Sequence, residues 1–442
     1  MPKGGSPSPL MLLYGFAGII ALGTILLMLP ISSKAGQLTP VVNALFTSTS
    51  AVCVTGLIVV DTGTYWSSFG QAVIIALVQI GGFGFMTGAT LFLIMMGRRI
   101  TLRERMLARE SMGMTPLGGL VGLVKRMAIF TIAIEGIGAA ILFFHLSSTH
   151  PPGTALWQGT FQAISAFNNA GFDIFGNFQS LGNYQGDPIM LGVTALLVIL
   201  GGISFMVIAD VFRFKRFGKF SLDSKIVLTT TGLLLALGMG LILFGEFSNP
   251  ATLGSMPLPQ KMLDAFFHSV TARTAGFTTI DMGKAVGFSL FLTMLLMFIG
   301  GAAGSTAGGI KVNTFGMLLA TIWCSIRGRE YAGAFGREFP EQQIHRALAI
   351  VTLAIGLVAI SVLLLTITEP FRFIDLLFET VSAFGTVGLS TGITPQLSLI
   401  GKIIIAVTMF CGRLGPITMA LSLVQRQQPS LYRYPQDMVR IG

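Results

Sequence analysis

Charge is scarce in this sequence. Asp, Glu, Lys and Arg make up 10% of the 442 residues, whereas 52% are hydrophobic, and the mean hydropathy is +0.79. A soluble protein of this length needs far more charged side chains to cover its surface. The composition therefore excludes an ordinary soluble domain and predicts a protein embedded in a lipid bilayer.

Cysteine and histidine are few as well. Cys53, Cys324 and Cys411 give no framework for disulfide bonds, and the four histidines are scattered without the spacing of a zinc site. No cluster of acid, base and nucleophile is visible along the chain. We therefore expect no enzyme active site and no organic cofactor.

Long apolar stretches are abundant. A helix needs roughly 20 apolar residues to cross the hydrocarbon core of a membrane. Six stretches of about that length or more are free of charge, and two others contain one charge each, Glu135 or Arg413. The sequence thus predicts eight spans, in 4–33, 62–97, 127–146, 188–209, 226–245, 285–310, 347–368 and 403–425.

The basic residues cluster in segments that eight spans would place on one side of the membrane. These segments are 97–126, 211–225, 327–346 and the stretch after Arg426. Because Lys and Arg are retained in cytoplasmic loops, we expect both termini in the cytoplasm of a multi-pass cell-membrane protein. The net charge of +10 then reflects membrane orientation and not nucleic-acid binding.

The opposite loops carry acids, among them Asp61, Asp173 and Asp187. Acids around a pore entrance concentrate cations. For any one of these acids, an equally good explanation of its position is that Lys and Arg are retained in the cytoplasm and leave the outer loops without positive charge.

One short pattern recurs four times. A Phe stands ten residues before each of Gly56, Gly171, Gly276 and Gly388, and these glycines are separated by 115, 105 and 112 residues. Such internal similarity predicts repeated structural units. The predicted boundaries are 8–99, 127–218, 225–328 and 346–428, followed by a cytoplasmic tail at 429–442.

Each recurring segment begins like a short helix. A proline lies 16 to 19 residues before each of the four glycines, and proline suits the first position of a helix. The space allows a helix of roughly 13 residues, about 20 Å long, which is too short to cross a membrane. We interpret it as a re-entrant helix, which is tolerated where protein or water surrounds it.

The glycine after each short helix suggests an ion filter. Successive carbonyls point at one axis when the backbone alternates between right- and left-handed conformations, and glycine adopts the left-handed one without steric cost. Rings of carbonyls can replace the water shell of a cation. A helix cap explains one such glycine well, but four copies in register favour a filter. Its predicted residues are Val54, Thr55, Gly56, Leu57, Asn169, Ala170, Gly171, Phe172, Thr274, Ala275, Gly276, Phe277, Thr386, Val387, Gly388 and Leu389.

At these residues the chain resembles the potassium transporters of the Trk, Ktr and plant high-affinity superfamily. Within it, the chain most resembles the membrane subunit of Ktr systems (KtrB type). The resemblance covers essentially the whole chain and is carried by VTGLIVVDTG, ISAFNNAGF, TARTAGF and SAFGTVGL. It implies an all-α membrane protein of four outer helix–pore helix–inner helix repeats around one pseudo-four-fold pore. It also implies potassium uptake, because sodium-transporting relatives have serine where this chain has Gly56.

Glycine also crowds the third inner helix. The run 300–310 reads GGAAGSTAGGI, and each glycine weakens a helix by up to about 1 kcal/mol. The resemblance implies an intramembrane gate loop that obstructs the pore under the filter; the alternative is close helix packing by small residues, which we prefer for Gly81-Gly82 and Gly201-Gly202. The gate-loop residues are Gly300, Gly301, Ala302, Ala303, Gly304, Ser305, Thr306, Ala307, Gly308, Gly309 and Ile310.

A few charged and polar side chains are expected beside the filter and the gate. A charge inside the membrane should face the bundle interior or water, and the resemblance places Arg413 near the gate loop, with Lys311 adjacent. Arg273 is expected to brace the filter through an acid such as Glu379 or Asp264. Asn168 and Glu379 are further candidates for filter support, and the partner of Glu135 cannot be named from the sequence.

The resemblance also implies partners. It predicts a homodimer with one pore per protomer and a separate cytosolic nucleotide-binding ring (KtrA-like) docked on the basic inner face. Potassium is the expected substrate, with sodium as a possible second ion.

Two other functions stay open. One is a sodium-coupled or sodium-selective transporter with alternating access, which usually has inverted or two-fold repeats, and four repeats in the same orientation argue against it. The other is a membrane enzyme or receptor.

Overall fold

The computed structural model describes residues 9–84 and 120–415. The basic cluster around residues 98–109 and the predicted tail at 429–442 lie outside these residues. Helices make up most of the described chain. Among the described residues, the strands form one two-stranded antiparallel sheet, which pairs β1 (Gly333–Ala334) with β2 (Arg337–Glu338).

The helices follow one order four times along the described chain. A long helix comes first, then a helix of 12 to 16 residues, then a further apolar helix. The first helices are α1 (Pro9–Met28), α7 (Leu120–Leu146), α11 (Leu222–Glu246) and α15 (Glu341–Thr368). The second are α2 (Val41–Val52), α8 (Pro152–Phe167), α12 (Leu258–Thr271) and α16 (Phe373–Gly385). The third are α4 (Ser68–Phe83), α9 (Pro188–Gly202), α13 (Gly287–Phe298) and α17 (Leu399–Leu414).

Three helices in the described part are long and apolar enough to cross a membrane by length and composition. They are Val124–Leu146, Leu222–Glu246 and Glu341–Thr368. A fourth crossing results if α9 and α10 (Phe205–Phe214), which meet at a bend of 97°, are counted as one span. Three other predicted spans, 4–33, 62–97 and 285–310, overlap the shorter apolar helices Leu13–Met28, Ser68–Phe83 and Gly287–Phe298. The eight-span count therefore stays a prediction.

The second helices have the predicted size and start. They contain 12, 16, 14 and 13 residues, close to the roughly 13 expected. Proline occupies the N-cap or the first turn of α2, α8 and α12, where its missing N–H costs nothing. The helix α16 instead starts after Arg372, whose guanidinium pairs with Asp375 in the first turn (Nε to Oδ2, 2.8 Å).

The C-terminal halves of these second helices lie in the protein core. All residues from Phe46 to Val52 in α2 and from Phe378 to Gly385 in α16 are buried. Many of these side chains are small or carry a hydroxyl, which lets backbones approach closely. The four helix ends therefore bring the segments that follow them to the centre of the molecule.

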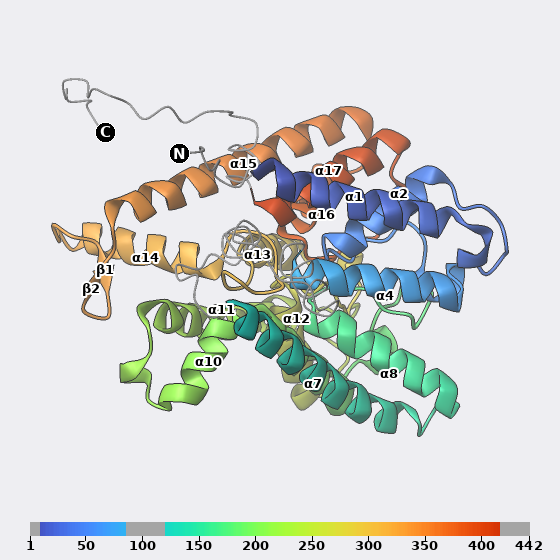
Figure 1. The fold of residues 1–442 in the computed structure, drawn as a ribbon, viewed down its shortest axis with the longest axis horizontal. Coiled ribbons are helices and arrows are strands. Elements are labelled where there is room, and N and C mark those ends of the chain that lie inside the picture. Colours follow the sequence, from blue (N-terminus) through green and yellow to red (C-terminus); the bar gives the residue numbers. More distant parts are fainter. Residues whose placement is uncertain (1–8, 85–119, 416–442) are drawn as a thin grey trace.

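The third inner helix is interrupted, as its glycines predict. The helix α13 ends at Phe298, and thirteen residues separate it from the start of α14 (Val312–Ile326). Between them Ile299 and Ile310 pair as a short parallel bridge, so the intervening residues form a closed loop with a narrow neck. Figure 1 shows α13 at the centre of the molecule.

The two ends of the molecule carry different connections. Figure 1 shows the α1–α2 and α7–α8 connections at one end, and α10, the hairpin and the start of α15 at the other. The predicted basic segments 211–225 and 327–346 therefore gather at a common end.

Candidate ion pathway

The four glycines of the predicted filter share an unusual backbone. The φ angles of Gly56, Gly171, Gly276 and Gly388 are +88°, +70°, +80° and +101°. Positive φ is the region that glycine enters without steric cost. The backbone at all four positions therefore favours glycine, as the sequence suggested.

The residue two positions before each glycine is also left-handed, although none of the four is glycine. The φ angles of Val54, Asn169, Thr274 and Thr386 are +58°, +57°, +72° and +49°. Such a conformation costs a residue with a side chain about 1–2 kcal/mol, and it persists where the surrounding structure enforces it. The predicted alternation of backbone conformations therefore holds in every filter segment.

The four glycines close a ring in chain order. A Cβ added to Gly56 would lie 2.5 Å from the Ala170 carbonyl oxygen, and one on Gly171 would lie 2.9 Å from the Ala275 oxygen. A Cβ added to Gly276 would lie closer still to the Val387 carbonyl oxygen, and one on Gly388 to the Thr55 carbonyl oxygen. In all four cases the carbonyl belongs to the residue before the next glycine. Each segment thus abuts the next, and the fourth abuts the first.

Hydroxyl groups hold the filter segments from behind. Ser50 and Ser382 accept hydrogen bonds from the N–H groups of Gly56 and Gly388, both at 3.1 Å. In the other two segments a hydroxyl donates to the carbonyl that follows the glycine: Ser165 to Phe172 (2.6 Å) and Thr271 to Phe277 (2.7 Å). Sequence reasoning missed these residues, although a serine six residues before the glycine in three repeats was a usable signal.

The third repeat is one residue shorter between its anchoring hydroxyl and its glycine. Thr271 lies five residues before Gly276, whereas the corresponding serines lie six before theirs. The buried Phe of this repeat is accordingly Phe267, at 1% exposure, and not Phe266, which the ten-residue spacing suggested. This corrects the register of the third repeat.

A wide cavity opens on one side of the glycine ring. Its volume is ≈ 770 Å³, and all four glycines line it together with Asp61, Asp173 and Asp281. Asp61 accepts hydrogen bonds from the N–H groups of Thr64 (2.7 Å) and Phe178 (2.6 Å). Burial, and secondarily the charge of Asp61, raises the pKa of Asp173 to about 7. The cavity can therefore attract cations to the ring.

Asn168 ties the second filter segment to two neighbouring helices. Its amide Nδ2 donates to Glu135 Oε1 on α7 and to Gln79 Oε1 on α4, both at 2.9 Å. Gln79 also donates to Glu135 Oε2 at 3.4 Å. The partner of Glu135, which the sequence could not name, is thus an amide pair directly behind the filter.

Glu379 supports the chain that leaves the fourth filter segment. Its side chain is fully buried in α16 and accepts hydrogen bonds from the hydroxyls of Ser390 and of Thr394, the latter at 2.9 Å. Its partners therefore lie beyond Gly388 in the chain, on the cavity side of the ring.

The predicted gate loop, residues 300–310, packs beside the predicted filter and against α9. Ala302 N–H donates to Gly202 O (2.9 Å), and the Thr306 hydroxyl donates to Gly201 O (3.0 Å). A Cβ on Gly308 would collide with the Thr386 hydroxyl, so the loop touches the fourth filter segment. The structure thus brings the loop and the filter together.

Two basic side chains hold the tip of the gate loop. Arg413 donates to Thr306 O through Nη1 and to Gly81 O on α4 through Nη2. Lys311 donates to Ala307 O. Carbonyls freed where a helix unwinds need donors of this kind inside a membrane protein.

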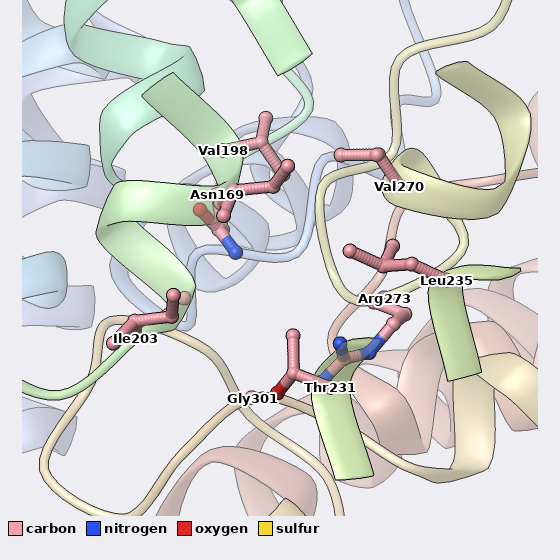
Figure 2. A pocket seen from close by; sticks show the side chains of 10 residues that line it. Asn169, Val198, Ile203, Thr231, Leu235, Val270, Arg273 and Gly301 are labelled. Atoms are coloured by element: carbon pink, nitrogen blue, oxygen red, sulfur yellow. The ribbon is translucent and has the colours of Figure 1, made fainter. Parts of the chain in front are cut away.

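Arg273 does not bind the acids that sequence reasoning proposed for it. Its Nη2 donates to Gly300 O at 3.2 Å. Among the residues that the structure describes, no ion pair involves Arg273. Glu379 is committed to Ser390 and Thr394, and Asp264 accepts from Gly186 N–H at 3.0 Å. The prediction of an acidic partner was wrong, because Arg273 faces the gate loop and a small cavity (Figure 2).

The paired glycines of the first two inner helices serve close packing, as expected. A Cβ on Gly81 would collide with the Val52 carbonyl, and one on Gly201 with the Phe167 carbonyl. Gly412 on α17 meets Phe384 in the same way. Each of these helices thus contacts a carbonyl in the last turn of its neighbouring short helix, which explains why small residues are needed there.

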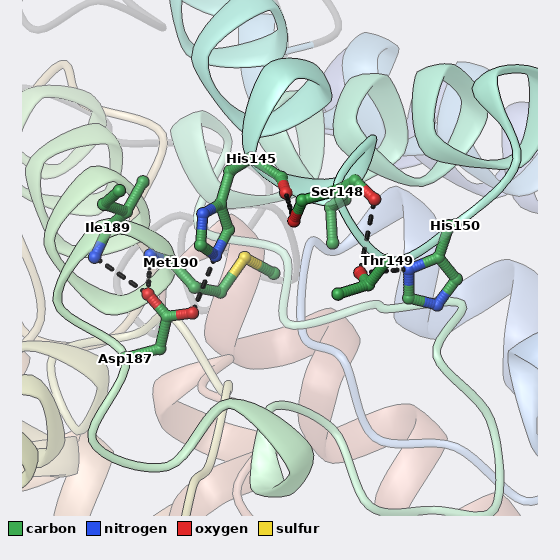
Figure 3. Close-up of polar contacts among 8 residues, drawn as sticks. His145, Ser148, Thr149, His150, Asp187, Ile189 and Met190 are labelled. Carbon is green, nitrogen blue, oxygen red and sulfur yellow. Dashed lines mark hydrogen bonds and ion pairs between the residues drawn. The ribbon is translucent and has the colours of Figure 1, made fainter.

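Asp187 acts as a helix cap. It accepts hydrogen bonds from Ile189 and Met190 N–H at the start of α9, at 2.9 and 3.0 Å, and contacts His145 Nε2 at 2.7 Å (Figure 3). An Asp at this position stabilises the first turn of a helix. Of the acids expected at the pore entrance, this one therefore joins α7 to α9.

Three comparisons with known proteins point to the same family. The model of the TrkH family, described as cation transport protein, matches residues 15–434. Ktr system potassium uptake protein B of Bacillus subtilis is 44% identical over 98% of this chain and 96% of its own length. Potassium/sodium uptake protein NtpJ of Enterococcus hirae is 38% identical over 98% of this chain and 97% of its own. The crystal structure of the potassium transporter TrkH from Vibrio parahaemolyticus has the same fold, with a TM-score of 0.72 at 20% identity over 96% of this chain and 87% of that one.

Proposed function

This chain belongs to the TrkH family of cation transport proteins, and from that premise we propose that it takes up potassium across the cell membrane. The names of its relatives, potassium uptake and potassium/sodium uptake proteins, support potassium as the substrate. The observation that carries the proposal is the closed ring of four left-handed glycines at the ends of four short buried helices.

The ion-selective element of this proposal is the ring itself. Carbonyls of the filter segments (54–57, 169–172, 274–277 and 386–389) coordinate a dehydrated potassium ion. The partial negative charges at the C-terminal ends of α2, α8, α12 and α16 stabilise that ion. Each segment has one glycine, whereas the filter of potassium channels has two. The proposed filter is therefore simpler and offers fewer strict ion sites.

The proposed architecture follows the four repeats. Each repeat contributes an outer helix, a pore helix and an inner helix, which gives eight spans and one pseudo-four-fold pore. The four-fold order of helices and the closed glycine ring support this arrangement. The 770 Å³ cavity is then the outer mouth, and both chain ends are cytoplasmic.

The proposed gate is the loop at 300–310. It touches the filter segment at Thr386 and is tied to Arg413. A fixed positive charge about 5 Å from a cation repels it by a few kcal/mol at an effective dielectric near 20. Closed, the loop blocks the path both sterically and electrostatically, and withdrawing it opens the pore.

The proposed partners follow from the relatives that carry the name Ktr system. The membrane subunit forms a homodimer, and a cytosolic nucleotide-binding ring docks on its basic inner face and pulls the gate. The relative named for potassium and sodium supports sodium as a stimulating or coupled ion. A sodium-coupled transporter with alternating access is the alternative.

Potassium uptake in cells that lack their own uptake systems tests the proposal. The chain, expressed with its regulatory partner, should restore growth at low potassium and raise potassium influx. Measuring influx with and without sodium separates stimulation by sodium from independence of it. Gly276→Val, which fills the ring, is the matched negative control. No influx from well-expressed protein in reconstituted vesicles would contradict the proposal.

A further inference from the structure

The third filter segment is preceded by a buried arginine that neither the filter nor the gate, as proposed, explains. Arg273 follows α12 and is 8% exposed. Removing one partner of a buried charge is costly, because the charge is left without compensation. No carboxylate among the described residues pairs with Arg273. The carbonyl that accepts its hydrogen bond is therefore important for stabilising the buried charge.

That carbonyl belongs to the neck of the gate loop. Arg273 Nη2 donates to Gly300 O at 3.2 Å, while Gly300 N–H donates to Ile310 O at 2.8 Å. The two ends of the loop are therefore joined at the residue that Arg273 holds. A Cβ on Gly300 would also lie 3.3 Å from Thr274 Cγ2, so the filter residue after Arg273 packs against the same point.

The loop is thus held at two points by arginines of different elements. Arg413 on α17 binds the tip at Thr306, and Arg273 binds the neck from the chain that enters the filter. Only Thr274 separates Arg273 from Ala275, whose carbonyl lies close to Gly171. Movement of the neck is therefore transmitted to the ring through a very short path.

Space beside the guanidinium lets it respond. A cavity of ≈ 20 Å³ is lined by Arg273, Asn169, Thr231 and Gly301, and Figure 2 shows the guanidinium and the Asn169 amide facing into it. Arg273 Nε is buried without a protein partner. A volume of this size admits about one water molecule, which would satisfy Nε and leave the side chain room to turn.

We propose that Arg273 is a positioning residue that couples the third filter segment to the gate loop, so that withdrawing the loop also changes the ion preference of the filter. This inference rests on the proposed function and deepens it. When the neck moves, the hydrogen bond between Gly300 O and the Arg273 guanidinium breaks. The guanidinium then turns to another acceptor, and this shifts Thr274, the next residue in the chain. Coupling between sites is reciprocal, so an ion that stabilises the third filter segment also stabilises the closed loop.

A double-mutant cycle in vesicles that contain the purified chain tests the coupling. The four proteins are the wild type, a deletion of residues 301–309, Arg273→Met, and the two changes combined. Maximal potassium flux and the potassium-to-sodium permeability ratio are measured for each. In the wild-type background the deletion should raise flux and shift the ratio about fivefold or more, at the lower end of typical coupling between sites. In the Arg273→Met background it should raise flux and leave the ratio unchanged.

The conservative variant separates coupling from simple bracing. Arg273→Lys keeps a charged donor and should preserve most of the ratio shift caused by the deletion, and it carries the comparison if Arg273→Met does not fold. An equal ratio shift in wild-type and Arg273→Met backgrounds, or no shift in either, would overturn the inference. Absence of potassium flux from the wild type would instead contradict the proposed function.

Discussion

The four filter glycines have the same conformation and different surroundings. Around Gly171 the nearest atom to an added Cβ is a carbonyl oxygen at 2.9 Å, and around Gly56 it is one at 2.5 Å. Gly276 and Gly388 approach their neighbours more closely still. At all four positions a residue with a side chain costs about 1–2 kcal/mol, because the backbone is left-handed. The additional effect of each substitution on the ring therefore depends on the contacts of its Cβ.

Substitution of the glycines one at a time should therefore give a graded loss of potassium preference. We expect Gly276→Ala and Gly388→Ala to reduce the potassium-to-sodium ratio most, Gly56→Ala less and Gly171→Ala least. Replacing any of them by Ser should let sodium compete better, since the side chain crowds the axis. The measurement is competition between the two ions in flux through reconstituted vesicles.

Gly36 offers a matched control for the backbone cost. Its φ is +67°, and nothing lies within 4 Å of an added Cβ, so Gly36→Ala should lower stability slightly and leave selectivity unchanged. An unchanged ratio in all four filter variants would show that the ring does not select ions.

Asp173 should make uptake depend on external pH. Burial, then the charge of Asp61, raises its pKa to about 7, against hydrogen bonds from Phe175 N–H and Ser180 that favour the charged form. The carboxyl is therefore mostly charged at pH 8 and mostly neutral at pH 6. Losing this charge in the cavity, which we place at the outer mouth, should weaken the apparent potassium affinity about two- to fivefold as pH falls. Charged clefts raise the local concentration of ions of opposite charge, and this effect is lost when Asp173 is neutral.

Two variants check the assignment of that pH dependence. Asp173→Asn should hold the apparent affinity near its low-pH value at both pH 6 and pH 8. Asp281→Asn removes an exposed acid of the same cavity and should lower affinity at both values while keeping the dependence. A dependence that survives in Asp173→Asn would assign it to another group.

Side-chain partners were harder to predict than backbone conformations. The need for glycine follows from local sterics at each position, so a repeated pattern was sufficient to find all four. The partner of Arg273 depends on which side of the ring its side chain faces, and no local signal carries that information. The Glu135–Asn168–Gln79 contacts join residues from three helices, and only tertiary packing brings them together.

At the scale of elements, the helix interruption with many glycines was predicted, and the one with a single glycine pair was missed. The eleven residues from 300 to 310 contain five glycines, and α13 ends just before them. The bend of 97° between α9 and α10 was not predicted. Its signal was present, because Ser204 follows two glycines and caps α10 by accepting from Met206 N–H at 3.3 Å.

The contacts of the gate loop predict that it holds the resting pore closed. Arg413→Ala, or deletion of part of 301–309, should raise the maximal flux and leave the apparent potassium affinity roughly unchanged. These variants should also depend less on a regulatory partner, because the obstruction that the partner removes is already weakened. Flux in vesicles with matched protein content measures both effects.

Arg413 needs a companion variant because it also binds Gly81 on α4. Thr306→Val removes the hydroxyl that donates to Gly201 (3.0 Å) and leaves the α4 contact intact, so it should raise flux by a smaller factor. Lower or unchanged flux from both folded variants would mean that these contacts stabilise the fold and not the closed gate.

At the scale of the whole molecule, ring closure is what the sequence could least specify. The four segments were recognisable as copies of one another, but the sequence does not say which segments touch. In the structure each segment contacts the next in chain order, from Gly56 to Gly171, Gly276 and Gly388, and the last contacts the first. Closure depends on how the repeats pack, as in Lys402 Nζ, which donates to Asn43 Oδ1 at 3.5 Å and joins the last repeat to the first. Pairings of such large sequence separation leave no local trace in the chain.

The orientation of the whole molecule gives the last prediction. Lys and Arg set topology by being retained in the cytoplasm, and two basic segments, 211–225 and 327–346, gather at one end of the fold (Figure 1). Single cysteines introduced at 215–224 and 330–345 in a variant without Cys53, Cys324 and Cys411 should react with a membrane-impermeant maleimide only after the cells are opened. Cysteines in the α7–α8 connection (147–151) should react in intact cells and serve as the matched control. The same inner accessibility is expected for 103–125 and 430–442. Labelling of any of these inner segments from outside would break the eight-span arrangement, because adding or removing one crossing reverses the side of every segment that follows it.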